Sequence, residues 1–242
     1  MRKVALVTGA GRGIGHATSI ALSRAGYAIT MMARSERQLA DAVIEVEKEQ
    51  GFGRALAVIG DVRDEDDCEA AVRKTLESFG RLDVLVNNAG IFRTAPLIES
   101  STEMWKEVLD TNLTGVFLIT RAAVRAMAQS HQGGIIVNVS SMAGKLGYPG
   151  SGAYCASKFG LGGFSAAIRV ELRGHGIRVV LLCPGQVDTH AWDQCGLDLE
   201  ALGIRRETMM RPEEVAEAIV FAAARSGEAA PEEILLTPRS GS

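Results

Sequence analysis

A tyrosine and a lysine one helical turn apart are well suited to acid and base chemistry in this sequence. Tyr154 and Lys158 stand at positions i and i+4 of a stretch with helical spacing, so both side chains project from one face. A phenol with its ordinary pKa of about 10 is a poor base at neutral pH, but a nearby ammonium group favours the phenolate. The pair predicts proton transfer, and its plain alternative is two residues on a helix surface.

A glycine-rich turn near the start of the chain predicts a phosphate-binding site. The turn Gly9-Ala10-Gly11-Arg12-Gly13-Ile14-Gly15 follows the apolar run Val4 to Thr8 and precedes a helical stretch. Its glycines permit unusual backbone angles and let a pyrophosphate approach the next helix N-terminus. The pattern is TGxxxGIG rather than GxGxxG, and a tight turn without a ligand is the alternative. Its position after a strand favours a dinucleotide.

The residues after the second apolar run bear on which dinucleotide is bound. A carboxylate at this place binds the ribose of NAD, whereas a guanidinium receives the 2′-phosphate of NADP. The sequence has Ala33-Arg34-Ser35 here, with Arg12 as a second cation in the glycine turn. We therefore expect NADP(H) to be preferred over NAD(H). Glu36 lies close by and weakens this preference, and either arginine could instead be solvated.

Short apolar runs alternate with stretches of helical spacing along the chain, which predicts a doubly wound α/β fold. The seven predicted strands are Val4 to Thr8, Ala28 to Met32, Ala55 to Ile59, Leu82 to Val86, Ile135 to Val139, Val179 to Leu182 and Ile234 to Leu236. The predicted helices are Ile14 to Ala25, Glu36 to Gln50, Glu65 to Phe79, Glu103 to Ala128, Ala153 to Arg173 and Pro212 to Ala224. With no linker or repeat, residues 1–242 are expected to form a single domain.

Composition excludes several classes of partner. The net charge of -3 and the pI of about 5.9 provide no basic surface for nucleic acid. The four cysteines lack the spacing of a zinc site or a disulfide framework, so we expect no metal and a reducing, cytoplasmic location. No apolar segment approaches the roughly 20 residues that cross a bilayer, so no membrane partner is expected.

Several motifs in a fixed order resemble those of the short-chain dehydrogenase/reductase family along nearly the whole chain. They are Thr8 to Gly15, Asp61-Val62, Asn87-Asn88-Ala89-Gly90, Thr111-Asn112, Ser141 thirteen residues before Tyr154-x-x-x-Lys158, and Pro184-Gly185-x-Val187-x-Thr189. The resemblance implies a Rossmann-type, seven-stranded parallel sheet with helices on both faces. It also implies an oxidoreductase that moves hydride between a nicotinamide cofactor and a carbonyl or secondary alcohol carbon.

The resemblance implies a catalytic tetrad of Asn112, Ser141, Tyr154 and Lys158. Tyr154 would give its proton to the nascent alkoxide in ketone reduction, and Ser141 would hold the substrate oxygen against it. Asn112 would hold a water that relays protons with Lys158. Without this context, Ser141 would be interpreted as a turn or capping residue. Asparagine is a mediocre helix former, so a local kink is expected at Asn112.

The resemblance also implies a set of cofactor contacts. Asp61 would bind the adenine amino group, although it could instead belong to an acidic helix start. Val187 and Thr189 would hold the nicotinamide carboxamide. The full predicted set is Gly9, Arg12, Gly13, Ile14, Gly15, Arg34, Asp61, Val62, Asn88, Ala89, Gly90, Tyr154, Lys158, Pro184, Gly185, Val187 and Thr189.

The motifs leave the substrate open. A carbonyl reductase similar to the β-ketoacyl carrier-protein reductases is the leading candidate, and alternatives are a sugar or polyol dehydrogenase or a non-catalytic NADP-binding sensor or scaffold. Residues 186–211 are rich in apolar side chains, which fits either a mobile lid or an ordinary packed loop. Family members commonly dimerise through helices that match 103–128 and 153–173, so a homodimer or homotetramer is expected.

Overall fold

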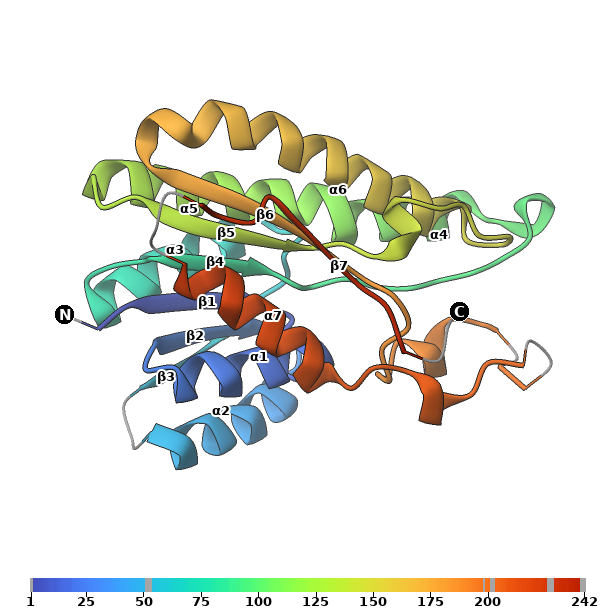
Figure 1. The fold of residues 1–242 in the computed structure, drawn as a ribbon, viewed down its shortest axis with the longest axis horizontal. Helices are drawn as coiled ribbons and strands as arrows, with labels where there is room; N and C mark the ends of the chain where they lie inside the picture. The colour runs from blue at the N-terminus through green and yellow to red at the C-terminus, as the bar shows by residue number, and fades with distance from the viewer. Residues whose placement is uncertain (1, 51–53, 198, 201–202, 226–228, 240–242) are drawn as a thin grey trace.

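A seven-stranded parallel sheet forms the centre of the computed structural model (Figure 1), which describes residues 2–50, 54–197, 199–200, 203–225 and 229–239. The strands are β1 Val4–Thr8, β2 Ala28–Ala33, β3 Ala55–Ile59, β4 Val84–Asn87, β5 Gly134–Val139, β6 Ile177–Pro184 and β7 Glu233–Leu236. The helices are α1 Gly13–Arg24, α2 Glu36–Gln50, α3 Glu65–Phe79, α4 Thr102–Leu109, α5 Gly115–Ser130, α6 Gly152–Glu171 and α7 Pro212–Ala224. The strand order is β3-β2-β1-β4-β5-β6-β7.

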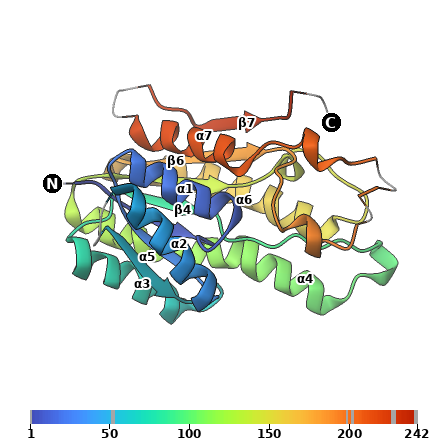
Figure 2. The ribbon, with the colours of Figure 1, turned by 90° about the horizontal axis from the view of Figure 1, so that it is seen from below.

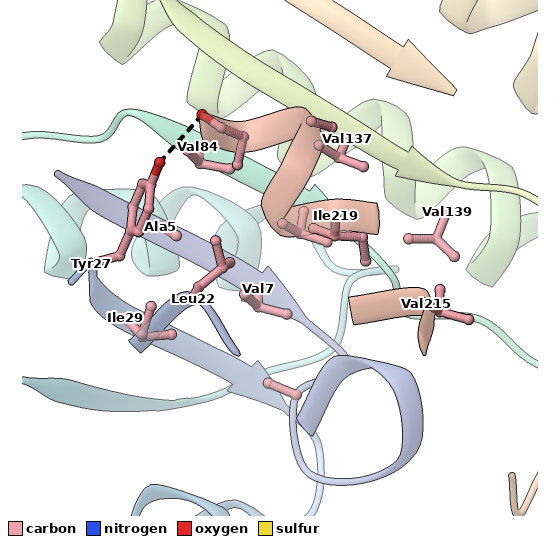
Figure 3. Packing of buried hydrophobic residues seen from close by; sticks show 14 of the residues in the cluster. Ala5, Val7, Leu22, Tyr27, Ile29, Val84, Val137, Val139, Val215 and Ile219 are labelled. Carbon is pink, nitrogen blue, oxygen red and sulfur yellow. Dashed lines mark hydrogen bonds between the residues drawn. The ribbon is translucent and has the colours of Figure 1, made fainter. Parts of the chain in front are cut away.

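Helices cover both faces of the sheet, as the nearly continuous apolar strands predict. One buried cluster packs α1, α2 and α7 against the sheet, and a second packs α3, α5 and part of α6 against the other face. Figure 2 shows these two layers on opposite sides of the strands. In the first cluster, Leu22 and Ile219 pack over Val7 and Val137, and the Tyr27 hydroxyl donates to the Ala223 carbonyl of α7 at 3.2 Å (Figure 3). Each such fully buried aliphatic side chain stabilises the fold by about 2 kcal/mol.

The predicted strands and helices are confirmed, with about half of their ends unchanged and the others moved by one or two residues. The main difference is the predicted helix Glu103 to Ala128, which is divided into α4 and α5 by a π-helical turn, Asp110–Thr114. Asn112 lies inside this turn, where the expected kink is found. Such turns interrupt the regular i to i−4 hydrogen bonds and often mark functional sites.

The loops that follow β4, β5 and β6 emerge at one end of the sheet (Figure 1). Short 3₁₀ turns occur in these loops, namely η1 Leu97–Glu99, η3 Met142–Gly144, η5 Trp192–Gln194 and η6 Arg206–Thr208. The strand order reverses direction between β1 and β4, so their connections lead to opposite faces and leave a crevice at their carboxyl ends. Ligands bind at this place in open α/β sheets.

Polar side chains are bonded to one another inside the sheet core. The Asn87 amide donates to the Thr120 hydroxyl and to Asn138 Oδ1, both at 2.8 Å, and Asn138 Nδ2 donates to Ser165 Oγ at 2.8 Å. All four side chains are buried. Because buried polar groups are costly without partners, this network fixes β4 and β5 against α5 and α6.

No described helix has the length and apolar character that crossing a membrane requires. Within the same residues, no three or more His, Cys, Asp or Glu side chains gather as a potential metal site.

Replacing Asn138 with alanine is expected to lower the free energy of unfolding by about 1–3 kcal/mol, because Asn87 and Ser165 lose a buried partner. Urea denaturation measures this loss. A double-mutant cycle with Ser165→Ala isolates the bond between the two side chains, and strictly additive losses would show that the network contributes nothing as a unit.

Candidate active site

Thr8 and Asn88 join the loops that follow β1 and β4. The Thr8 hydroxyl accepts from the backbone N–H groups of Asn88 and Ala89, each at 3.1 Å. In return, the Asn88 amide donates to the Thr8 carbonyl at 2.9 Å and to the Gly9 carbonyl at 3.3 Å. These four bonds fix the crevice where the strand order reverses, and they place Asn88 and Ala89 beside the glycine turn.

The glycine turn is packed too closely for side chains. A Cβ on Gly9 would lie 2.9 Å from Ala89 Cα, and the residue has a φ of +64° that favours glycine. A Cβ on Gly15 would overlap the Gly9 carbonyl and the Asn88 amide. Gly13 has a φ of +57° and stands at the first position of α1. The turn thus exposes backbone at a helix N-terminus, the arrangement that binds pyrophosphate.

A cavity of about 530 Å³ opens over this turn. The predicted cofactor contacts that line it are Gly9, Arg12, Gly13, Ile14, Arg34, Asp61, Val62, Asn88, Ala89, Gly90 and Thr189. It reaches from the ends of β2 and β3 across the crevice to the loop after β6. A long ligand with a central pyrophosphate fits this cavity. The glycine turn lies along the cavity, and guanidinium groups line its wall.

Arginines surround the only predicted cofactor carboxylate in the cavity wall. Asp61 accepts hydrogen bonds from Arg63, at 3.0 Å from Nε to Oδ2, and its Oδ2 lies 3.8 Å from Arg34 Nη1. Partial burial acts to raise the pKa of Asp61, but the hydrogen bonds and charges of Arg63 and Arg34 outweigh it and lower the pKa. Asp61 precedes α3, whose N-cap is Asp64, so it is not part of the helix start.

The structure brings the predicted phenol, hydroxyl and ammonium together where β5 meets α6. The Ser141 hydroxyl lies near enough to Tyr154 to act on the pKa of the phenol, and Lys158 Nζ lies 5.7 Å from the centre of the Tyr154 ring. Ser141 caps η3 by accepting from the Ala143 N–H at 3.1 Å. The neighbouring Ser140 is buried and donates instead to the Lys158 carbonyl at 3.3 Å. This geometry favours Ser141 over Ser140 as the group beside the phenol.

Burial sets the proton affinities of the pair in the free protein. It raises the pKa of Tyr154 to about 12, with the Ser141 hydrogen bond acting in the opposite direction. It lowers the pKa of Lys158 to about 8. The Tyr-Lys spacing predicts a lowered pKa for the phenol, and this is not found in the free protein. Burial has the larger effect on the Tyr154 pKa, and the Lys158 ammonium donates to the Val139 carbonyl at 2.9 Å.

Asn112 is held by the loop after β4. Its Oδ1 accepts from the Ile91 N–H at 2.8 Å, and its Nδ2 donates to the Ile91 carbonyl at 2.9 Å and to Ser157 Oγ at 3.1 Å. The side chain is completely buried, so it anchors this loop to α6. The backbone of the π-helical turn is thereby placed on the α6 side of the site.

Several predicted residues lie outside the cavity wall. Gly15 lies beneath the turn, and the Gly185 N–H donates to the Leu236 carbonyl at 2.7 Å. Pro184 ends β6, and Val187 pairs with Met210 in an isolated parallel bridge. Tyr154, Lys158, Ser141 and Asn112 do not line the cavity in the described part of the chain either.

The cavity wall also contains residues that were not predicted from the sequence, namely Gly11, Met32, Ala33, Ser35, Gln38, Gly60, Ile91, Phe92, Arg93, Thr111, His190, Ala191 and Gln194. Phe92 and Arg93 stand two and three residues after the last glycine of the Asn-Asn-Ala-Gly motif, so their position was an available signal. Gln38 had no such signal in the sequence, because only the packing of α2 brings its Cβ close to Gly11. His190 lines the wall as well, although its sequence context provides no firm reason to include it.

The segment 186–211 packs onto itself and onto the loop after β4. Met210 N donates to the Gln186 carbonyl at 3.0 Å and Asp188 N donates to the Met210 carbonyl at 2.9 Å, which closes its two ends. Arg206 binds Asp188 at 2.9 Å. These contacts match the packed-loop alternative, and ligand-dependent closure stays a prediction. Positions 198, 201 and 202 of this segment lie outside the described residues.

Comparison with known proteins gives extensive similarity. Residues 3–199 match the family described as short chain dehydrogenase. A 3-oxoacyl-[acyl-carrier-protein] reductase of Synechocystis sp. is 40% identical over 91% of this chain and 89% of its own length. A cis-4-hydroxycyclohexanecarboxylate dehydrogenase of Sinomonas cyclohexanicum is also 40% identical, with the same two coverages.

Solved structures match over nearly the whole chain. An alcohol dehydrogenase from Thermococcus sibiricus, complexed with 5-hydroxy-NADP, has a TM-score of 0.86 and 31% identity, covering 98% of this chain and 96% of that one. A variant of the actinorhodin polyketide ketoreductase, solved with NADPH, has a TM-score of 0.87 and 34% identity, covering 98% and 95%.

Lys158 is expected to make stability depend on pH. Its pKa falls from 10.5 in the unfolded chain to about 8 in the folded one, so between these values the unfolded state binds more protons. The free energy of unfolding should therefore rise from pH 8 to pH 10, by no more than about 3 kcal/mol. Above pH 10 the raised pKa of Tyr154 acts in the opposite direction.

Urea denaturation across this range, in the wild type and in Lys158→Met, measures the effect. In Lys158→Met the free energy of unfolding should no longer rise between pH 8 and pH 10. Lys74→Met, which removes an exposed lysine of α3, should retain this rise. A rise that persists in Lys158→Met would assign the pH dependence to another group.

Proposed function

Since this chain belongs to the short chain dehydrogenase family of oxidoreductases, we propose that it interconverts a ketone and a secondary alcohol with NADP(H) as the preferred cofactor. The observation that carries the proposal is that Ser141 and Lys158 both lie beside the Tyr154 phenol, whose ring contacts Phe92 in the wall of a cavity shaped for a dinucleotide. The substrate class is a 3-oxoacyl thioester or another small carbonyl compound. The names of the relatives include an acyl carrier-protein reductase and a dehydrogenase of a cyclic alcohol, so the proposal extends to both.

The residues of the cavity provide the groups that would hold the cofactor. Gly9, Gly13 and the N-terminus of α1 would receive the pyrophosphate, and Asn88 and Ala89 would border the adenosine. Thr189, with Val187 behind it, would face the nicotinamide carboxamide. When bound, the reduced nicotinamide supplies a hydride for the carbonyl carbon.

The catalytic role of Tyr154 follows from its hydrogen atom and its neighbours. A neutral phenol, which the raised pKa ensures in the free protein, is the proton donor that a forming alkoxide requires. Ser141 would donate to the same substrate oxygen and orient it. In the reverse direction Tyr154 accepts the alcohol proton, and the positive charge of an oxidised nicotinamide would favour its phenolate.

Lys158 and Asn112 would return protons to Tyr154. Lys158 has a pKa of about 8, so at neutral pH it carries a proton that it can exchange. Asn112 is bonded to Ser157 of α6 from within a π-helical turn, where the disrupted helix bonding would supply a backbone carbonyl for a relay water.

Two guanidinium groups support the choice of NADP(H). Arg12 and Arg34 both line the cavity, and Glu36 is absent from the described residues that line it. Arg34 is 58% exposed, so it can turn toward a phosphate at little cost. A 2′-phosphate would form charge-assisted hydrogen bonds with it.

Exposed aromatic side chains support a homodimer or homotetramer. Trp105 of α4, Phe117 of α5 and Phe159 of α6 are each more than 40% exposed. Large apolar side chains gathered on a surface often mark protein contacts, so these helices would form the contact between copies.

Tyr154→Phe is expected to lower kcat by about 10²–10⁴-fold, because it removes the proton donor and leaves the ring. NADPH absorbance, followed with ketones, β-ketoacyl thioesters and sugars, measures turnover, and NADPH fluorescence measures binding, which should persist. Tyr148→Phe alters an exposed loop tyrosine and should retain turnover. Tight NADPH binding without turnover of any compound by the wild type would instead support a sensor or scaffold.

Arg34→Asp is expected to lower the NADPH/NADH ratio of kcat/KM by at least about tenfold, because it replaces a phosphate partner by a like charge. Arg37→Asp makes the same charge change three residues further on, outside the cavity wall, and serves as the matched control. An unchanged ratio in Arg34→Asp would refute its role in cofactor choice.

A further inference from the structure

Phe92 separates the cavity from the catalytic tyrosine. Its ring centre lies 4.7 Å from that of Tyr154, with the ring planes tilted by 53°. Phe92 lines the cavity, whereas Tyr154 and Ser141 do not in the described residues. A carbonyl group that approaches the Tyr154 hydroxyl from the cavity must therefore pass beside the Phe92 ring.

Trp192 packs a second ring against Phe92, behind the cavity wall. Its ring meets Phe92 edge-on, with centres 5.6 Å apart and planes at 83°. The indole N–H donates to the Val187 carbonyl at 2.9 Å, which fixes the ring on the segment after β6. Phe92 thus contacts the rings of both Tyr154 and Trp192, and the three rings form one aromatic cluster beside the proposed proton donor.

The backbone on either side of Phe92 is fastened. Ile91 exchanges two hydrogen bonds with the Asn112 side chain. Arg93 donates to the Gln194 carbonyl at 3.0 Å, and Thr94 donates to the Cys195 carbonyl through both its backbone N–H and its hydroxyl. The position of the Phe92 ring is therefore determined by both loops, and it is tied to the short turn that carries Trp192.

We propose that Phe92, together with Trp192, determines substrate specificity by favouring ketones whose carbonyl is attached to a flat ring. This inference rests on the proposed function and narrows its substrate class to aryl and cyclic conjugated ketones. Aromatic rings at centre distances of 4.5–7 Å attract one another beyond the effect of the area they bury, through offset and edge-on contacts. A linear alkyl chain at the same place gains only the burial of apolar area.

Turnover of a matched pair of ketones tests this preference. Acetophenone and 2-octanone have the same number of carbon atoms, and only the first carries a ring. The wild type should favour acetophenone in kcat/KM, and Phe92→Leu should lower the acetophenone/2-octanone ratio by about 3- to 10-fold, because leucine keeps the apolar bulk and removes the ring. Trp192→Leu should shift the ratio in the same direction.

Phe221→Leu is the matched control, since it removes a half-exposed phenylalanine of α7 that is outside the cavity wall. It should leave the ratio unchanged. An equal acetophenone/2-octanone ratio in wild type and Phe92→Leu would overturn the proposal and show that the three rings serve only to pack the two loops.

Binding gives a second measurement that needs no turnover. Trp105→Phe leaves Trp192 as the remaining tryptophan of the two in the chain. In this background, with NADP⁺ present, quenching of Trp192 fluorescence should give a lower Kd for acetophenone than for 2-octanone, and Phe92→Leu should remove the difference. Selective binding of acetophenone without turnover would support this inference and refute the proposed reaction. Turnover with equal Kd values for the two ketones would support the reaction and refute this inference.

Discussion

A buried ammonium group is costly unless hydrogen-bond acceptors replace the lost water, and Lys158 is buried at the carboxyl end of β5. Its Nζ donates to the Val139 carbonyl, and its own carbonyl accepts from the Ser140 hydroxyl. A Cβ on Gly144 would lie 2.8 Å from this carbonyl, so the strand end, η3 and α6 approach one another as closely as glycine allows. This close packing holds Ser141 against Tyr154. The arrangement of the proposed catalytic groups thus depends on how one lysine is accommodated.

The cavity is positioned by a second, polar constraint at the crevice between β1 and β4. Thr8 and Asn88 bond the two loops across it, and the glycines fit only because no side chain intervenes. From there Asn112 connects the loop after β4 to α6 through Ile91 and Ser157. The loop after β4 is therefore bonded at one point to the glycine turn and at another, through Asn112, to the helix that carries Tyr154. The fold thus places the glycine turn before α1 and Tyr154 on α6, and the described residues hold no cluster that could bind a metal.

Much of the fold was predictable because its signals are local and periodic. Buried strands are nearly continuous apolar runs, and the helices between them keep their spacing over several turns. The π-helical turn could be anticipated only as a kink, since Asn112 within it is bonded to a backbone 21 residues earlier, which local sequence does not reveal. The place of Arg93 shortly after the Asn-Asn-Ala-Gly motif was a signal for the cavity wall, but its bond to a segment 101 residues away has no local signal in the sequence. The direction of the Tyr154 pKa shift was also hidden, because helix spacing reveals the neighbouring ammonium but not the burial of both groups.

The central claim is that the binding of an oxidised nicotinamide nucleotide converts a buried, neutral phenol into a usable base. The chain has three tyrosines, so ¹³C labelling of the tyrosine Cζ atoms gives an NMR spectrum in which Tyr154→Phe assigns the critical resonance. Without nucleotide, Tyr154 should titrate with a pKa of about 12. With saturating NADP⁺, its pKa should fall below that value, because a positive charge nearby favours the phenolate. The same pKa with and without NADP⁺ would contradict the account.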